Sequence, residues 1–219
     1  MKDINDIKII GVTGSIGSGK STVSRIMEGF GGVIINADEI AKELMKKGKE
    51  AYNSVVMCFG KSVLAPDGEI DRKILGNMVF NDREKLYLLN SLTHEKAGLE
   101  IKRKAAEIKR ELCLTPYRKG DLRFITLDVP IPVENGFFDI SDSIWTVTAN
   151  DDIRLERIME RNGITQKEAE SIMASQMSNR EYEEIADIVI INEGDTAELK
   201  KTVAAELVNY FGIDIDERY

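Results

Sequence analysis

The chain has 219 residues, of which 42% are hydrophobic and 31% are charged, and its formal net charge at pH 7 is −8. This length suffices for one large domain or for a core that carries an inserted subdomain. The negative charge argues against a general nucleic-acid binder, so an anionic substrate would need locally gathered positive charge. No apolar run approaches the roughly 20 residues that span a bilayer, and we expect no membrane partner.

The N-terminal residues and the cysteines indicate the cellular compartment. Residues 1–6 form a short acidic stretch, unlike a secretory signal peptide. The two cysteines, Cys58 and Cys113, are too few for a disulfide framework and do not have the pattern of a zinc site. We therefore expect two free thiols in a reducing cytoplasm.

The pattern Gly-x-x-x-x-Gly-Lys-Ser occupies residues 14–21, with every fixed position filled. Glycine lacks a Cβ and tolerates positive φ, so successive N–H groups can face one concavity and bind phosphate. In this pattern the lysine reaches the β and γ phosphates and the serine hydroxyl is a Mg²⁺ ligand. The motif thus predicts a bound phosphate chain and Mg²⁺, with Ser21 at the metal. The predicted phosphate contacts are Gly14, Gly17, Ser18, Gly19, Lys20, Ser21 and Thr22.

The flanking residues provide the setting that this motif needs. Residues 7–12 form a β-branched apolar run typical of a buried strand. Residues 21–30 carry apolar side chains at helical spacing, namely Val23, Ile26, Met27 and Phe30. Strand, loop and helix therefore follow one another as a phosphate site requires. The alternative is a glycine-rich turn that binds nothing.

A second apolar run, residues 33–35, ends at Asn36-Ala37-Asp38. Open α/β sheets bind ligands at the carboxyl ends of their strands. Asp38 could face the γ-phosphate, bind Mg²⁺ or accept a proton from a substrate hydroxyl. The alternative is an N-cap for the helix predicted over residues 39–47, since Asp is a good cap. The phosphate loop upstream favours the chemical role.

Residues 39–113 lack strong strand signals and predict several helices, with turns at Gly48, Gly60 and residues 66–68. The last helix, about residues 95–112, carries Lys102, Arg103, Lys104, Lys109 and Arg110. Such a cluster is usually a solvated face, with a patch for substrate phosphates as the alternative. The only histidine, His94, precedes this helix, and a lone histidine is more often structural than catalytic.

The second half of the chain alternates strands and helices. We predict strands over residues 122–129, 144–149 and 187–192, a loop over residues 130–136 and a closing helix over residues 196–211. This alternation predicts an α/β fold with a parallel sheet covered on both faces. Asp128, near the end of the third strand, could belong to the Mg²⁺ shell or bond to loop backbone.

Two helices are predicted between the fourth and fifth strands. The first, over residues 153–161, carries Arg154, Arg157 and Arg161 near one face. Arginines at a phosphoryl-transfer site stabilise the transferring group, and the alternative is a solvated face. The second begins at a capping box of Thr165 and Glu168 and runs to about residue 177. Two helices joined at Asn162-Gly163 could form a mobile lid.

The order of these landmarks resembles the dephospho-CoA kinase family over nearly the whole chain. The matching stretches are residues 12–23, 36–41, 59–60, 67–68, 71–72, 89–94, 130–134 and 186–194, with Arg157, Arg161 and Gln176. The resemblance implies a P-loop NTPase three-layer fold with a parallel sheet. It divides the chain into a kinase core (residues 1–38, 120–150 and 185–219), a helical CoA-binding insertion (39–119) and a helical lid (151–184).

The resemblance also implies that the nucleotide is ATP and that the activity is transfer of its γ-phosphate to the ribose 3′-hydroxyl of dephospho-CoA. This reaction gives CoA and ADP in the last step of coenzyme A biosynthesis. The implied catalytic residues are Asp38, which orients or deprotonates the hydroxyl, together with Lys20 and Arg157. The implied ATP contacts outside the loop are Arg157, Arg161 and Asn192, and the implied substrate contacts are Thr13, Asp38, Arg72 and His94.

Some positions depart from the family pattern. Asn36 stands where the family usually has Asp, which removes a negative charge near the metal. Ile131-Pro132 replaces a usual pair of leucines, and Glu95 replaces a proline after His94, so the substrate loop can differ in geometry and affinity. Three alternatives stay open: another nucleoside or nucleotide kinase of this fold, a nucleotide-binding regulator that hydrolyses little ATP, and a purely structural helical module.

Overall fold

The structure is a computed structural model that describes residues 7–80, 82–116 and 122–212. The acidic residues 1–6 and the domain limits predicted at residues 1, 119, 120 and 219 lie outside these ranges. Within the described ranges, no helix combines the length and the apolar character needed to cross a membrane.

Five parallel strands form one sheet in the order β2-β3-β1-β4-β5. Their bounds are β1 Lys8–Gly14, β2 Gly32–Asn36, β3 Phe124–Asp128, β4 Ser143–Thr148 and β5 Ile188–Ile191. The register pairs Val12 with Asp128 and Asn36 with Asp128. The ends of β1, β2 and β3 therefore meet at one edge, which is where open α/β sheets bind ligands.

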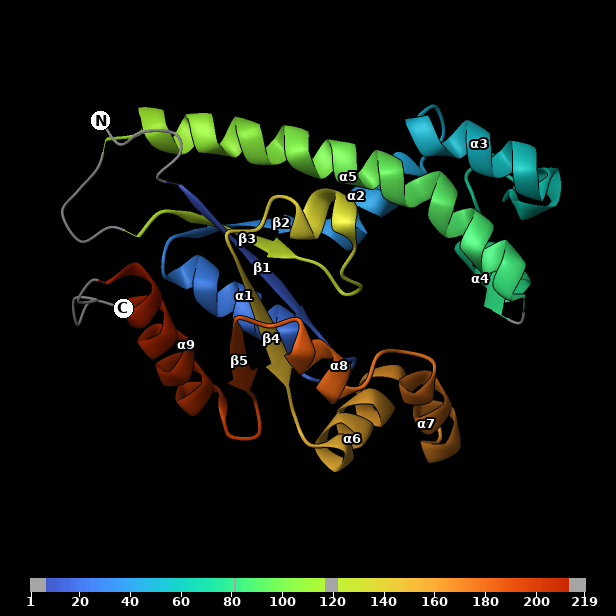
Figure 1. Ribbon diagram of the computed structural model, residues 1–219. Helices are drawn as coiled ribbons and strands as arrows, with labels where there is room; N and C mark the ends of the chain where they lie inside the picture. Colours follow the sequence, from blue (N-terminus) through green and yellow to red (C-terminus); the bar gives the residue numbers. More distant parts are fainter. Residues whose placement is uncertain (1–6, 81, 117–121, 213–219) are drawn as a thin grey trace.

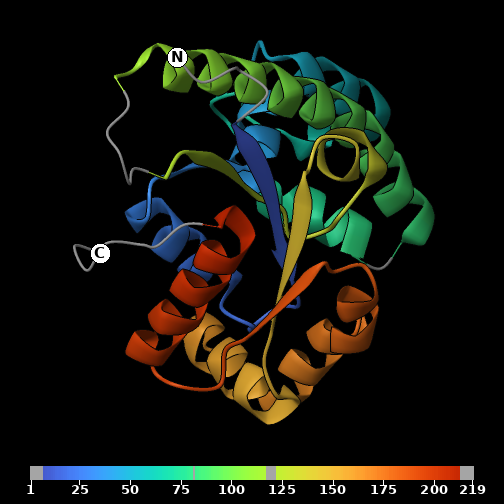
Figure 2. The same ribbon diagram turned by 60° about the vertical axis from the view of Figure 1, so that its left-hand side comes forward.

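Helices cover both faces of the sheet (Figures 1 and 2). Helices α1 (Lys20–Gly29) and α9 (Thr196–Phe211) pack on one face, while α2 (Ala37–Leu44) and α5 (Arg83–Leu114) pack on the other. Neighbouring residues of β1 serve opposite faces, since Ile9 joins the core under α5 and Ile10 joins the core under α1. The predicted three-layer fold is confirmed.

Helices α2, α3 (Glu50–Phe59), α4 (Arg72–Phe80) and α5 lie between β2 and β3 in the chain, with a 3₁₀ turn at Lys61–Val63. Helix α5 begins at Arg83, so the predicted start near residue 95 is wrong. The reason is local: the side chain of Asp82 accepts a hydrogen bond from Lys85 N at 3.0 Å and caps the helix. The added turns place Leu89 and Leu92 against the small core of α3 and α4.

Between β4 and β5 lie α6 (Asp151–Asn162), α7 (Gln166–Ala174) and α8 (Asn179–Glu184). The capping box of Thr165 and Glu168 is confirmed at the start of α7. Helix α8 was not predicted, although Ser178 and Glu181 form a second capping box there. The segment after β3 makes a tight turn at Glu134–Phe138, in which Asn135 and Gly136 have non-helical backbone angles, and this agrees with the turn or loop predicted over residues 130–136.

Candidate active site

The phosphate loop joins β1 to α1, and its last glycine is the N-cap of that helix. Gly19 has φ 90° and ψ 20°, in the left-handed region that favours glycine. A Cβ added at Gly19 would overlap the side-chain amide of Asn192. Lys20 and Ser21 therefore begin the helix, whose first N–H groups and positive dipole end favour a bound anion.

Side chains from three later segments hold the outside of this loop. Nε of Arg154 donates to the carbonyl of Ile16 at 2.9 Å, and Nδ2 of Asn192 donates to the carbonyl of Ser18 at 2.7 Å. The hydroxyl of Ser15 donates to Oδ1 of Asn179 at 2.7 Å. Because these carbonyl oxygens are bound from outside, the loop is preorganised and its N–H groups are available on the inner side.

Arg154 corrects one expectation. This residue is only 3% exposed, and its Nη1 lies 2.6 Å from Oδ1 of Asp151. It faces neither phosphate nor solvent, so the idea that three arginines of α6 share one role is wrong. Helical spacing puts residues three and four apart on neighbouring surface, but the packing of α6 against the loop buries the first of the three.

A cleft of about 670 Å³ opens on the inner side of the loop. It brings together many of the predicted contacts, namely Gly14, Gly17, Gly19, Lys20, Ser21, Thr22, Asp38, Arg157 and Arg161. The structure adds Arg25, one helical turn after Ser21, whose Nε donates to the Ser21 carbonyl at 3.2 Å. Arg25 was not predicted as a site residue, although the i,i+4 spacing puts it on the same side of the helix as Ser21. Gln176 also lines the cleft.

Lys20 forms an ion pair with Asp128 at the end of β3. The Asp128 carboxylate is 2% exposed and accepts a hydrogen bond from the Ser24 hydroxyl at 2.9 Å. The suggestion that Asp128 binds loop backbone is therefore wrong, because its partners are side chains of α1. Burial lowers the pKa of Lys20 to about 8, and the nearby carboxylate of Asp38 opposes that change.

Asp38 lies in the first turn of α2 and does not cap that helix. The cap is Asn36, whose Oδ1 accepts a hydrogen bond from Glu39 N at 3.0 Å. The capping alternative for Asp38 is therefore wrong. Asn36, which stands where the family usually has Asp, caps the helix. The Asp38 carboxylate has no hydrogen-bond partner among the described residues and faces the cleft. It is free to accept a proton or a hydrogen bond from a substrate.

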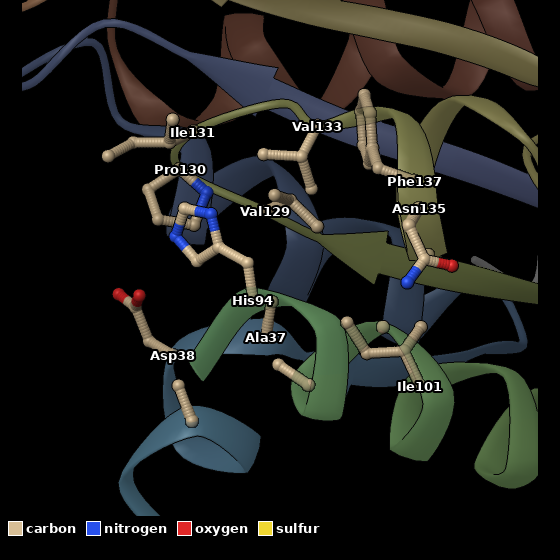
Figure 3. Close-up of a pocket in the computed structure, with 14 residues that line it drawn as sticks. Ala37, Asp38, His94, Ile101, Val129, Pro130, Ile131, Val133, Asn135 and Phe137 are labelled. Carbon is tan, nitrogen blue, oxygen red and sulfur yellow. The ribbon is translucent and has the colours of Figure 1, made fainter. Parts of the chain in front are cut away.

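A smaller pocket of about 100 Å³ adjoins the cleft at Asp38, Pro130 and Ile131. It lies between the helices α2 and α5 and the segment that follows β3 (Figure 3). His94 projects into it, and burial lowers the pKa of this imidazole, which favours the neutral form. Its other walls are Ala37, Ala41, Ala97, Gly98, Ile101, Val129, Val133, Asn135, Gly136 and Phe137.

Four predicted contacts line neither the cleft nor the adjoining pocket. Thr13 is fully buried in β1, and its hydroxyl has no partner in the described part of the chain. Arg72 lines a separate small pocket beside α2, together with Lys42 and Glu69. Ser18 is buried, and Asn192, 7% exposed, supports the loop from outside. Asn192 can therefore act on a bound phosphate through the shape of the loop.

This geometry defines a class of protein. A glycine-rich loop joins the first strand of a parallel sheet to a helix, and Arg157 and Arg161 also line its cleft. The carboxylate of Asp38, which has no hydrogen-bond partner among the described residues, faces the same space. Positioned cations and a carboxylate that orients the attacking oxygen are the requirements of phosphoryl transfer. The fold and the cleft are those of a P-loop kinase.

Comparison with known proteins identifies the family. A sequence model of the dephospho-CoA kinase family matches residues 8–198. The dephospho-CoA kinase of Carboxydothermus hydrogenoformans is 40% identical over 197 residues, which is 90% of this chain and 91% of that protein. The Bacillus cereus dephospho-CoA kinase is 38% identical over 206 residues, covering 94% of this chain and 98% of its own.

Solved structures agree. A Thermus thermophilus protein superposes with a TM-score of 0.72 at 27% identity, covering 93% of this chain and 97% of its own. Dephospho-CoA kinase from Campylobacter jejuni superposes with a TM-score of 0.65 at 25% identity, covering 93% and 96%. The chain belongs to the dephospho-CoA kinase family and is a kinase, which confirms the resemblance noted in the sequence.

Proposed function

We propose that this protein transfers the γ-phosphoryl group of ATP to the ribose 3′-hydroxyl of dephospho-CoA, giving CoA and ADP. The observation that most strongly supports this function is the position of Asp38, which lines both the phosphate cleft and the apolar pocket beside it. A phosphate donor in the cleft and a nucleoside acceptor at the pocket would meet at this carboxylate. Family membership supports dephospho-CoA as the acceptor.

An ADP-release assay with different acceptors tests this function. We expect dephospho-CoA to be phosphorylated faster than nucleosides and nucleoside monophosphates at equal concentration. A faster reaction with a nucleoside monophosphate would favour another small-molecule kinase of the same fold. Release of ADP that does not depend on any acceptor would contradict kinase function and favour a nucleotide-binding regulator.

In the proposed mechanism the acceptor oxygen attacks the γ-phosphorus in line. The bond from O3′ to phosphorus forms as the bond to the β–γ bridging oxygen breaks, and the hydroxyl proton passes to Asp38. Lys20 and Arg157 would neutralise charge on the β and γ phosphates. Arg157 already lies at the loop, since its Nη1 is 3.4 Å from the carbonyl oxygens of Gly17 and Ser18.

We propose that Mg²⁺ binds together with ATP. Among the described residues no group of three or more His, Cys, Asp or Glu side chains could hold a metal. The cleft does offer the hydroxyl of Ser21, an oxygen donor of the kind that Mg²⁺ prefers. Mg²⁺ usually keeps several waters and binds phosphate oxygens with few protein ligands, so this donor set fits. Bound Mg²⁺ would offset charge on the phosphates.

Ser21→Ala should raise the Mg²⁺ concentration for half-maximal rate by about tenfold, on the scale of one lost ligand contact. The melting temperature should stay near that of the wild type, because this side chain is exposed. The measurement is initial rate against Mg²⁺ at constant ATP. Thr202→Ala is the control, since it removes an exposed hydroxyl of α9 that does not line the cleft. Equal Mg²⁺ dependence in wild type and Ser21→Ala would contradict the assignment.

The rate should also report the ionisation of Lys20. Since burial lowers the pKa of Lys20 to about 8, the fraction of charged lysine falls above that pH. We expect kcat/KM for ATP, which reports the free enzyme, to decrease above about pH 8. In kcat at saturating ATP the decrease should move to higher pH, because bound phosphates favour the charged lysine. A kcat/KM for ATP that stays level to about pH 9.5 would contradict this prediction.

The remaining proposals concern the roles of the helical segments, the cellular location and the partners. We propose residues 39–119 as the part that binds the acceptor and residues 151–184 as a lid over ATP, with Arg157 and Arg161 on its first helix. We also propose a cytoplasmic enzyme with small-molecule partners and no nucleic-acid partner. The two cysteines support this location, since Cys58 and Cys113 are free thiols.

A further inference from the structure

Asn135 is a polar residue in the otherwise mostly apolar pocket beside Asp38. It belongs to the turn at Glu134–Phe138 that follows β3, and this turn packs closely on α5. A Cβ at Gly98 of α5 would lie 2.7 Å from both the carbonyl oxygen and Nδ2 of Asn135. The absence of a side chain at Gly98 therefore lets the turn approach the helix backbone. In Figure 3 Asn135 and Asp38 lie at opposite ends of the pocket.

The half-exposed Lys102 of α5 fixes the orientation of the Asn135 amide. Nζ of Lys102 donates to Oδ1 of Asn135 at 2.6 Å and lies 2.5 Å from Oδ2 of Asp139. The other oxygen of Asp139 accepts from Gly136 N at 2.7 Å, which ties the same turn together. An ammonium group can only donate hydrogen bonds, so the Asn135 atom that faces Lys102 is its oxygen.

The amide nitrogen of Asn135 therefore faces away from Lys102. Figure 3 shows this nitrogen turned toward the side of the pocket where Ile101 lies. It has no hydrogen-bond partner among the described residues. Because Asn135 is half-buried and its amide is held in one orientation, this donor is available to an acceptor on a ligand that enters the pocket. The pocket is thus prepared for a ligand that is mainly apolar and carries a hydrogen-bond acceptor at one end.

We propose that this pocket holds the adenine base of the acceptor, with Nδ2 of Asn135 donating to a ring nitrogen. This inference rests on the proposed function, which puts the ribose 3′-oxygen at Asp38. The base is bonded to the same ribose ring, so it must lie close to that carboxylate. On the other side the ribose leads to a diphosphate, and no described Lys or Arg lines the pocket to receive it.

The walls of the pocket suit a flat base. Ala37 and Ala41 of α2 and Ala97 and Gly98 of α5 present little side chain beside the larger His94 and Ile101. Val129, Pro130 and Val133 line the pocket from the segment that follows β3. Such a slot buries both faces of a ring, while Asn135 reads its edge. Asn135 is therefore assigned as a specificity residue, and Lys102 as the residue that positions it.

Asn135→Asp tests the donor with the least disturbance, because it keeps the size of the side chain and the pairing with Lys102. We expect KM for dephospho-CoA to rise about tenfold, the size of one hydrogen bond, with kcat and KM for ATP near wild type. Asn135→Ala should act in the same direction. Lys102→Met should raise the same KM by a smaller factor, because the amide is then free to turn. An unchanged KM in Asn135→Asp would overturn the assignment.

Arg103→Met is the matched control for Lys102→Met. Arg103 is the next residue of α5, but its partners are Glu100 and Glu107 on the exposed side of that helix. We expect its KM for dephospho-CoA to equal that of the wild type. A rise as large as that in Lys102→Met would mean that the effect comes from lost charge on α5, and would overturn the positioning role.

Binding experiments with two fragments of dephospho-CoA show which part of the acceptor contacts Asn135. With the ATP site filled by a non-hydrolysable ATP analogue, AMP and 4′-phosphopantetheine are titrated separately by calorimetry. We expect Asn135→Asp to weaken AMP binding about tenfold and to leave 4′-phosphopantetheine binding unchanged. The opposite pattern would overturn the adenine assignment. If the wild type fails to phosphorylate dephospho-CoA while AMP binding still depends on Asn135, the proposed function fails and the base pocket stands.

Discussion

Replacing Asp38 with alanine should reduce kcat for dephospho-CoA phosphorylation by about a hundredfold or more, because a positioned general base typically contributes 10²–10⁴ in rate. The Asp38 carboxylate faces the cleft without a hydrogen-bond partner among the described residues, so its removal breaks no structural hydrogen bond there. We therefore expect the variant to remain folded and to bind ATP as the wild type does. Steady-state kinetics and a nucleotide titration on the same preparation give both quantities.

Two further variants sharpen the Asp38 experiment. Asp38→Asn keeps the shape but cannot take the proton, so it should be nearly as slow as Asp38→Ala if proton transfer matters. If alignment of the hydroxyl is the main contribution, Asp38→Asn should retain much more activity. Glu39→Gln removes the neighbouring exposed carboxylate of α2 and should leave kcat unchanged. A near-wild-type rate in Asp38→Ala would refute the assignment of the base.

The predictable parts of this protein are those in which local backbone geometry dictates residue type. A phosphate-binding loop needs glycine at positions such as Gly19, where φ is positive and the Asn192 amide lies close by. Buried parallel strands need continuous apolar runs, and all five were predicted within a few residues. Asp38 was predicted because a carboxylate just after a strand lies at the ligand-binding edge of the sheet.

The unpredicted parts depend on which elements pack together. Nothing in the spacing of α6 distinguishes the buried Arg154 from Arg157, which lines the cleft. The pairing of Lys20 with Asp128 joins residues far apart in the chain. Asn135 carries no motif, and only the approach of its turn to α5 shows that Lys102 orients it. Such roles come from tertiary contacts that a single sequence does not display.

Lys20→Ala is the second variant for which we expect a large effect, with kcat lower by on the order of a hundredfold or more. In the proposed mechanism the protonated amine contacts the β and γ phosphates from the start of α1. Arg25 also lines the cleft, but its Nε is bonded to the Ser21 carbonyl at 3.2 Å. Arg25→Ala is therefore the matched control, with a smaller expected loss than Lys20→Ala.

The same lysine has a second task that stability measurements can separate from catalysis. Lys20→Ala leaves Asp128 as a buried carboxylate without its cation, although the Ser24 hydroxyl still donates to it. Unpaired buried charge is costly, so adding Asp128→Asn should stabilise the Lys20→Ala variant by about 1–3 kcal/mol. The double variant should stay as slow as Lys20→Ala. Chemical denaturation measures the first result and ADP release the second. Recovery of turnover in the double variant would show that the lost rate came from the stranded carboxylate, and that Lys20 acts on Asp128 and not on the phosphates.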